Sequence, residues 1–166
     1  MRKATRPTQE GRRSAVQARA ACVCGAVRLE IDVPAVWAWH DHGEASRRAQ
    51  GCAYATYVGS WKKRFRFLEG EDQLTRYEDS ELGTARSFCR RCGTPVLYER
   101  RRSSTMVNIP RALFETRTGR EPRYHLNLVQ QADWTWAGEA LEPLKGYPGV
   151  MFARPRKKKR PLDAPV

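Results

Sequence analysis

The chain has 166 residues, of which 40% are hydrophobic, and a formal net charge of +13. This length suits one domain with some tail, and the composition supplies enough apolar residues for a modest core. No apolar run approaches the roughly eighteen residues that a membrane-spanning helix needs, and the N-terminal stretch lacks the apolar segment of a secretory signal. These features exclude a protein with membrane-spanning helices, and we expect one compact domain in the cytoplasm.

The positive charge lies mainly at the two ends of the sequence. Residues 1–20 carry six basic side chains and one acidic one, and residues 153–166 carry the same numbers. Only +3 remains for the 132 residues between them. We therefore predict basic disordered tails at 1–20 and 153–166 around a nearly neutral domain at 21–152. The tails can give weak binding to nucleic acid or another polyanion, stay merely solvated, or act as a localisation signal through "RKKKR".

Strand patterns follow the first tail. Residues 24–33, "CGAVRLEIDV", alternate apolar and charged side chains with the period of a strand that buries one face. Later segments are short, rich in aromatic and β-branched residues, and separated by Gly, Asp, Ser or Pro. They are "CAYATYV" (52–58), "KRFRFLEG" (63–70), "LTRYED" (74–79), "TPVLYER" (94–100), "TMVNI" (105–109) and "YHLNLV" (124–129). The sequence therefore predicts a mostly β fold, a single compact antiparallel β domain.

Helical patterns are few and short. Residues 43–50, "GEASRRAQ", predict about two helical turns. Residues 110–116, "PRALFET", predict another short helix, with Pro110 suited to the first helical position because it has no N–H to leave unpaired. Helices are thus expected only as short turns between strands.

The five cysteines fall into two close pairs and one single residue. Cys22 and Cys24 form "CVCG", and Cys89 and Cys92 form "CRRCG", so each pair is followed by a glycine. Glycine tolerates the positive φ with which a metal-binding turn folds back to face its amide groups toward the thiolates. Closed sites of four thiolates typically hold structural zinc. We therefore predict that Cys22, Cys24, Cys89 and Cys92 bind one structural zinc ion across 64 intervening residues.

Two other interpretations of these cysteines stay open. Cys89 and Cys92 have the spacing of a thioredoxin-type redox pair, but that motif opens a helix and here it precedes the strand-like "TPVLY". The cysteines can also be inert buried residues, whereas disulfides are disfavoured by the expected intracellular context. Cys52 has no partner nearby in sequence and is interpreted as a small core residue rather than a nucleophile.

Several of these stretches together resemble one known family. They include "ACVCGAVRLEIDVP" (21–34), "SFCRRCGTPVLYE" (87–99) and "PRYHLNL" (122–128). From about Ala21 to Trp136 the sequence is similar to the glutathione-dependent formaldehyde-activating enzyme (GFA) family, which includes centromere protein V. The resemblance implies a compact β fold of the Mss4-like type, with the four paired cysteines at the positions of structural zinc ligands. It also implies a carbon–sulfur lyase that acts on adducts between glutathione and an aldehyde.

The same resemblance implies a second, catalytic zinc, which the family holds in the pattern Cys-His-Cys-x-x-Cys followed by Arg. Aligned without gaps, this pattern falls on "DHGEASR", so that Asp41, Gly43 and Ser46 stand where the thiolates would be. His42 and Arg47 match. Without thiolates a site loses most of its negative charge and its soft-ligand character. We therefore expect the second zinc site to be lost and the lyase activity to be altered or lost, with Asp41, His42 and Arg47 as the remaining catalytic candidates.

A second metal site of harder ligands is an alternative. An alignment shifted by one residue places His40 and His42 on the first two ligand positions and Ala45 on the third, which again restores no sulfur site. The two histidines would lie on one side of an extended segment, where Asp41 or Glu44 could add oxygen ligands. Histidines in a polar loop are more often surface or hydrogen-bonding residues, so this second ion is doubtful.

Two functions stay open on the sequence. The first is a GFA-like zinc protein that acts on glutathione–aldehyde adducts without the second zinc. The second is a non-catalytic, zinc-stabilised β scaffold that binds a small ligand, such as glutathione or a thiol adduct, or a macromolecular partner. Metal content separates them, because about two zinc ions per chain favour an enzyme-like site and about one favours the scaffold.

Overall fold

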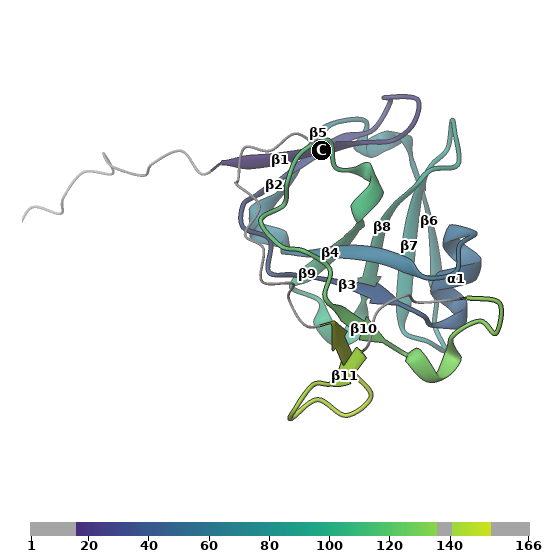
Figure 1. Ribbon diagram of the computed structural model, residues 1–166. Helices are drawn as coiled ribbons and strands as arrows, with labels where there is room; N and C mark the ends of the chain where they lie inside the picture. The colour runs from purple at the N-terminus through teal and green to yellow at the C-terminus, as the bar shows by residue number, and fades with distance from the viewer. Residues whose placement is uncertain (1–15, 136–140, 154–166) are drawn as a thin grey trace, which may run out of the picture.

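The computed structural model describes residues 16–135 and 141–153, and it contains two β-sheets (Figure 1). The smaller sheet has the order β1-β2-β5 and consists of β1 (Gln17–Ala21), β2 (Arg28–Asp32) and β5 (Phe65–Glu69). The larger sheet has nine strands in the order β11-β12-β10-β3-β4-β9-β8-β7-β6. They are β3 (Trp37–Asp41), β4 (Ala55–Trp61), β6 (Leu74–Asp79), β7 (Thr84–Cys89), β8 (Pro95–Arg100), β9 (Met106–Pro110), β10 (Tyr124–Leu126), β11 (Leu141–Pro143) and β12 (Met151–Ala153).

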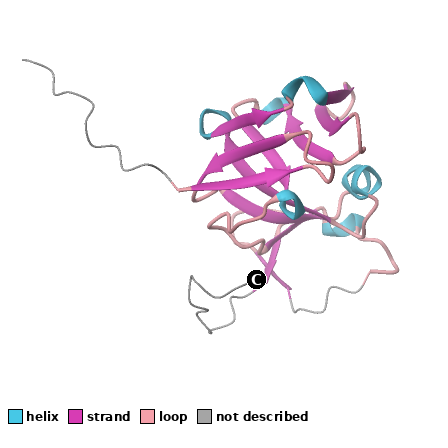
Figure 2. Cartoon of the chain, turned by 90° about the horizontal axis from the view of Figure 1, so that it is seen from above, coloured by secondary structure: helices cyan, strands magenta, loops and turns pink. Residues whose placement is uncertain are grey.

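Helical segments are short, and strands dominate the described chain (Figure 2). There is one α-helix, α1 (Glu44–Gln50), in the described ranges. The single 3-10 turns are η1 (Lys62–Arg64), η2 (Glu71–Gln73), η3 (Arg101–Ser103), η4 (Arg111–Leu113) and η5 (Leu128–Gln130). The predicted mostly β fold is therefore confirmed and is consistent with an Mss4-like arrangement. Within 16–135 and 141–153 no helix is long and apolar enough to cross a membrane.

The two predicted helices have different outcomes. The helix expected at 43–50 is α1, which ends at Gly51 in the left-handed conformation, with φ 62°. The one expected at 110–116 is only the 3-10 turn η4, and Pro110 ends β9 instead of beginning a helix. Pro110 pairs with Tyr57 in register, so the strand ladder extends through the position at which the helix was expected to start.

The tail boundaries were wrong where strands reach into them. β1 begins at Gln17, inside the predicted tail 1–20, and pairs with β2 along its whole length. Ala18 and Ala20 are buried in the core, while Arg19 between them is exposed. The strand alternation is weak in the sequence because both buried residues are small and the neighbouring residues include many basic ones. β12 likewise ends at Ala153, the first residue of the other predicted tail. Residues 1–15 and 154–166, the rest of both predicted tails, lie outside the described residues.

The sheets pack around an apolar core, and the other face of the large sheet carries a second apolar cluster. Leu29 and Ile31 of β2 are fully buried in the first cluster with Val58 of β4. Burying a side chain of this size contributes about 1.5–3 kcal/mol. Tyr57, next to Val58, packs with Trp39 in the second cluster, because successive side chains of a strand point to opposite faces. β4 is thus buried on both faces.

One strand pair departs from the predicted antiparallel arrangement. β10 runs parallel to β3, with His125 opposite His40 and Leu126 opposite Asp41. Parallel neighbours need a long connection, and here most of the domain lies between the two strands in sequence. This pairing brings the "PRYHLNL" segment beside the end of β3, where the family pattern falls.

Candidate functional site

The four paired cysteines converge as the sequence predicted. Their sulfur atoms all lie within 4.8 Å of one another. Cys22 Sγ is 3.6 Å from Cys24 Sγ, which is 3.8 Å from Cys89 Sγ. Four sulfurs around a tetrahedral zinc ion, each at about 2.3 Å, are separated by about 3.8 Å. Cys22, Cys24, Cys89 and Cys92 therefore fit a metal ion of this size, and we call them the cysteine quartet.

Both turns of the quartet have the predicted glycine conformation. Gly25 follows Cys24 with φ 73°, and Gly93 follows Cys92 with φ 71°. The folded-back backbone lets Gly25 donate to the carbonyl of Cys22 at 2.9 Å and Gly93 to the carbonyl of Cys89 at 2.8 Å. An ideal Cβ at either glycine meets no atom within 4 Å, so the backbone angle alone favours glycine there.

Thr94 joins the two turns. Its hydroxyl accepts a hydrogen bond from the N–H of Val23 at 3.3 Å and lies 3.1 Å from Cys92 Sγ. The Thr94 hydroxyl, together with the backbone N–H groups of Thr94 and Cys24, lowers the pKa of Cys92 to about 5. A thiol that ionises easily is a ready metal ligand, because the thiolate is the form that binds. The threonine of "CGTP" is thus a supporting contact of the quartet.

The family pattern at 41–47 falls on a hydrogen-bonded cluster. Asp41, 5% exposed, lies at the end of β3. Its Oδ1 accepts from the N–H of Gly43 at 3.0 Å and from Nδ2 of Asn127 at 2.8 Å. Its Oδ2 accepts from the hydroxyl of Ser46 at 2.8 Å. Both carboxylate oxygens therefore already have donors, which offsets the cost of burying the charge.

The three histidines of the chain gather behind this cluster. His42, fully buried, has its Nε2 at 2.8 Å from Nδ1 of His125. His40 has its Nδ1 at 2.9 Å from Oγ1 of Thr56, and its ring lies 4.8 Å from both the His125 and Tyr54 rings. Burial, followed by the charges of its two histidine neighbours, lowers the pKa of His40 to about 4. Burial and the charge of His125 lower the pKa of His42 to about 4 as well.

The residues at this second site do not fit a zinc ion. In the described part of the chain the quartet alone brings together three or more groups that could hold a metal ion. Asp41 is committed to three donors, and Glu44 forms an ion pair with Arg48 at 2.6 Å. The mixed site of His40, His42 and Asp41 or Glu44 is therefore not assembled.

A cavity of about 400 Å³ opens beside Asp41 and Ser46, and we call it the arginine pocket. α1, the β6–β7 turn, the ends of β7 and β8, and the segment after β10 form its walls. Four arginines are among its lining residues, Arg86, Arg100, Arg101 and Arg102. Asp41 is the one carboxylate among its lining residues. The pocket is therefore strongly positive in a domain whose total charge is nearly balanced.

Arg86 is held in place by three contacts. Its NH2 group donates to the Ser46 hydroxyl at 3.2 Å, and its NH1 group donates to the Tyr57 hydroxyl at 3.0 Å. Its guanidinium carbon lies 4.3 Å above the centre of the Tyr98 ring, a cation–π contact. Through Ser46, Arg86 is linked to Asp41 without pairing with it directly.

The comparison with known families agrees with this geometry. The sequence profile described as "Glutathione-dependent formaldehyde-activating enzyme" matches residues 17–130, more than half of the chain. The chain belongs to this family. No curated protein sequence matches it. Among solved structures, a crystal structure of a Rhodobacter sphaeroides protein is 24% identical, covers 58% of this chain and 87% of its own, and superposes with a TM-score of 0.49.

For this GFA-family chain the structure brings Asp41, Gly43 and Ser46 together. A Cβ on Gly43 would lie 3.0 Å from Oδ1 of Asp41, and Asp41 is bonded to Ser46. The candidate catalytic residues are not all in one place. Asp41 lines the arginine pocket, whereas His42 and Arg47 are not among the residues that line it. Arg47 donates from Nε to the carbonyl oxygen of His42 at 3.2 Å and so supports the backbone after β3.

The arginine pocket was not predicted from the sequence. Arg86 comes from β7, while Arg100 to Arg102 end β8 and begin η3. The run "ERRR" at 99–102 was the available signal, but charge counted over the whole domain averages it away. Cys52 is half-buried against the second apolar cluster, and burial raises its pKa.

Proposed function

We propose that this GFA-family protein holds one structural zinc ion in the cysteine quartet and binds a small ligand in the arginine pocket without a zinc-dependent lyase step. One observation carries the proposal: at the first of the replaced thiolate positions, both oxygens of Asp41 are already bonded to Gly43, Asn127 and Ser46. A carboxylate used in this way stabilises the protein and has little left to offer a second ion.

The zinc supplies folding energy in this proposal. Four thiolates close the coordination sphere and leave no position for substrate, so the ion clamps the β1–β2 turn to the β7–β8 turn. The cysteine pairs are far apart in sequence, and holding them together restricts the unfolded chain.

The family suggests one candidate ligand for the arginine pocket. A glutathione–aldehyde adduct carries carboxylates, and the guanidinium groups of the arginine pocket suit carboxylates through paired N–H donors. A cytoplasmic location and weak polyanion binding by the basic ends of the chain stay predictions from the sequence.

Two measurements test the proposal. Elemental analysis of the purified full chain should give about one zinc ion per chain, and Cys89→Ala should remove it. Exchange of the hydroxymethyl adduct of glutathione, followed by NMR, should run no faster with the protein than in buffer. Two zinc ions per chain, or exchange accelerated by the protein and abolished by Asp41→Ala, would contradict it.

A further inference from the structure

The four arginines of the arginine pocket lack the carboxylate partners that some other arginines of the domain have. Arg66 contacts Glu30 at 3.0 Å and Asp32 at 2.8 Å, and Arg76 contacts Glu78 at 2.8 Å. In the described residues no carboxylate lies within ion-pair distance of Arg86, Arg100, Arg101 or Arg102. These charges repel one another in a shared cavity, which is a cost that an anionic ligand would remove.

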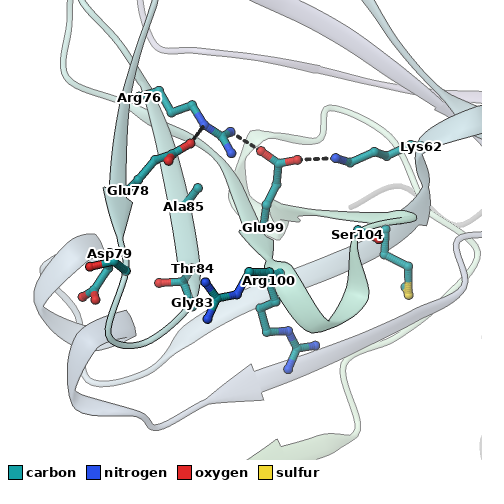
Figure 3. A pocket seen from close by; sticks show the side chains of 13 residues that line it. Lys62, Arg76, Glu78, Asp79, Gly83, Thr84, Ala85, Glu99, Arg100 and Ser104 are labelled. Atoms are coloured by element: carbon teal, nitrogen blue, oxygen red, sulfur yellow. Dashed lines mark hydrogen bonds and ion pairs between the residues drawn. The ribbon is translucent and has the colours of Figure 1, made fainter.

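Glu99, the acidic residue next to Arg100 in sequence, points away from the arginine pocket. Glu99 directs its carboxylate toward Lys62, at 2.6 Å, and Arg76, while the Arg100 side chain extends in the opposite direction (Figure 3). This follows from strand geometry, because neighbours on β8 alternate between faces. The adjoining cavity that Figure 3 shows, about 320 Å³, is thus balanced by its own acids, Glu78, Asp79 and Glu99. Arg100 and Arg101 line both cavities, but none of these three acids lines the arginine pocket, where Asp41 is the one carboxylate.

Arg100 also leaves a donor unused. Its Nε is buried and has no hydrogen-bond partner in the described part of the chain. A buried donor without a partner costs about 1–3 kcal/mol, and a ligand can remove this cost only if the Arg100 side chain shifts to expose Nε to the cavity. Arg101 and Arg102 are exposed at the rim, so their guanidinium groups are accessible to a ligand.

The volume of the arginine pocket and the chemistry of its walls restrict which ligands it can bind. About 400 Å³ is the volume of a small-molecule site, too small for a folded partner. Tyr98 and Leu82 give part of the wall an apolar surface for an organic body. Asp41, the one carboxylate, is taken up by its own donors, so a ligand's ammonium group finds no open counter-charge in the lining. The pocket therefore favours a ligand that is negative throughout.

We propose that the arginine pocket binds a small organic anion of net charge −2, such as a phosphate monoester or a dicarboxylate, through Arg100, Arg101 and Arg102, with Arg86 as a preset fourth cation. The inference rests on the proposed function in one respect, that this cavity binds a ligand and not a metal. It goes further in naming the charge of that ligand. Glutathione, with an ammonium group and net charge −1, should bind more weakly than either dianion.

The test is direct binding to the zinc-loaded full chain at low salt. Phenyl phosphate, succinate and glutathione are titrated by calorimetry, with glycerol as the neutral control. We expect phenyl phosphate or succinate to bind at millimolar or lower concentration, and to lose affinity at least fivefold between 50 and 300 mM salt, since each neutralised charge adds to the salt dependence.

Variants locate the binding. Arg101→Gln combined with Arg102→Gln should weaken the dianion at least tenfold, and it alters only exposed side chains. Arg28→Gln, an exposed arginine of the smaller sheet, is the matched control and should leave binding unchanged. Zinc content and thermal unfolding are measured for each variant to confirm that it is folded.

Three results would overturn the inference: no binding of either dianion at 10 mM, unchanged binding in the double variant, or an equal loss in Arg28→Gln, which would mean binding by general positive charge. Each of them leaves the proposed function intact if zinc content is one and adduct exchange is not accelerated. Two zinc ions per chain would instead overturn the proposed function, whatever the anion result.

Discussion

The cysteine quartet and the cluster around Asp41 occupy the same domain and are held together by different means. In the quartet four sulfurs meet, and although the N–H of Val27 and the Thr94 hydroxyl lie beside them, the sulfurs once ionised need a cation to offset their repulsion. Around Asp41, each carboxylate oxygen already faces an N–H or O–H group. The difference shows two ways of stabilising buried negative groups: a cation is needed in the quartet, whereas hydrogen bonds from neighbouring donors suffice around Asp41.

Removing one ligand of the quartet should give the largest effect. Cys89→Ala deletes a fully buried ligand of the ion, and we expect loss of zinc and destabilisation by several kcal/mol, because metal binding is folding energy in such sites. Elemental analysis and urea unfolding measure both. Cys52→Ala is the matched control and should keep its zinc. Full zinc occupancy in Cys89→Ala would refute the quartet.

Introducing cysteines into the Asp41 cluster should let it bind zinc, as the cysteine quartet does. The triple variant Asp41→Cys, Gly43→Cys, Ser46→Cys puts three thiolates where three positions already converge. We expect the zinc content to rise from about one ion to about two per chain. Ser46→Cys alone should stay at one. A folded triple variant that still binds one zinc ion would show that more than the ligand type separates the regions.

The histidine cluster should make the domain sensitive to acid. His40 and His42 have pKa values of about 4 in the fold, below the ordinary value of 6.5. As the pH falls from 6.5 to 4, the unfolded chain takes up these protons before the folded one does. Stability is therefore complete above pH 6.5 and falls toward pH 4, by about 3 kcal/mol for each histidine that keeps its full shift.

Urea unfolding across this pH window measures the loss. A variant with His40→Gln and His42→Gln should show a flatter dependence, and what remains in it reports the thiolates and carboxylates. Equal slopes in the two proteins would mean that these histidines are not the acid-sensitive groups.

The smallest effect is expected at Thr94, which supports the quartet without being a ligand. Thr94→Val removes the hydroxyl between the N–H of Val23 and Cys92 Sγ, and we expect zinc affinity to fall about tenfold, as for other groups that orient metal ligands. Competition with a zinc chelator measures this. Thr94→Ser keeps the hydroxyl and should behave as the unmodified protein. Equal affinities in both variants would remove Thr94 from the site.

Strand prediction succeeded for some segments and failed for others. β6 has the predicted bounds, Leu74–Asp79. β3 was missed because Ala38 and Trp39 are both buried on a central strand, which erases the alternation. β7 was missed because its inward positions, Ala85, Ser87 and Cys89, are small or polar. In each case the alternation of buried and exposed side chains depends on which elements cover the strand, and those elements are distant in sequence.

By itself the sequence determined the cysteine quartet, the mostly β character and the absence of thiolates at Asp41, Gly43 and Ser46. These depend on residue type and on short spacing, which are local properties. Only the tertiary structure decided that β10 lies parallel to β3, that the three histidines meet, and that Arg86 joins Arg100 to Arg102 in one cavity. Such contacts arise when strands far apart in the chain share a face, so net charge and periodicity along the sequence do not contain them.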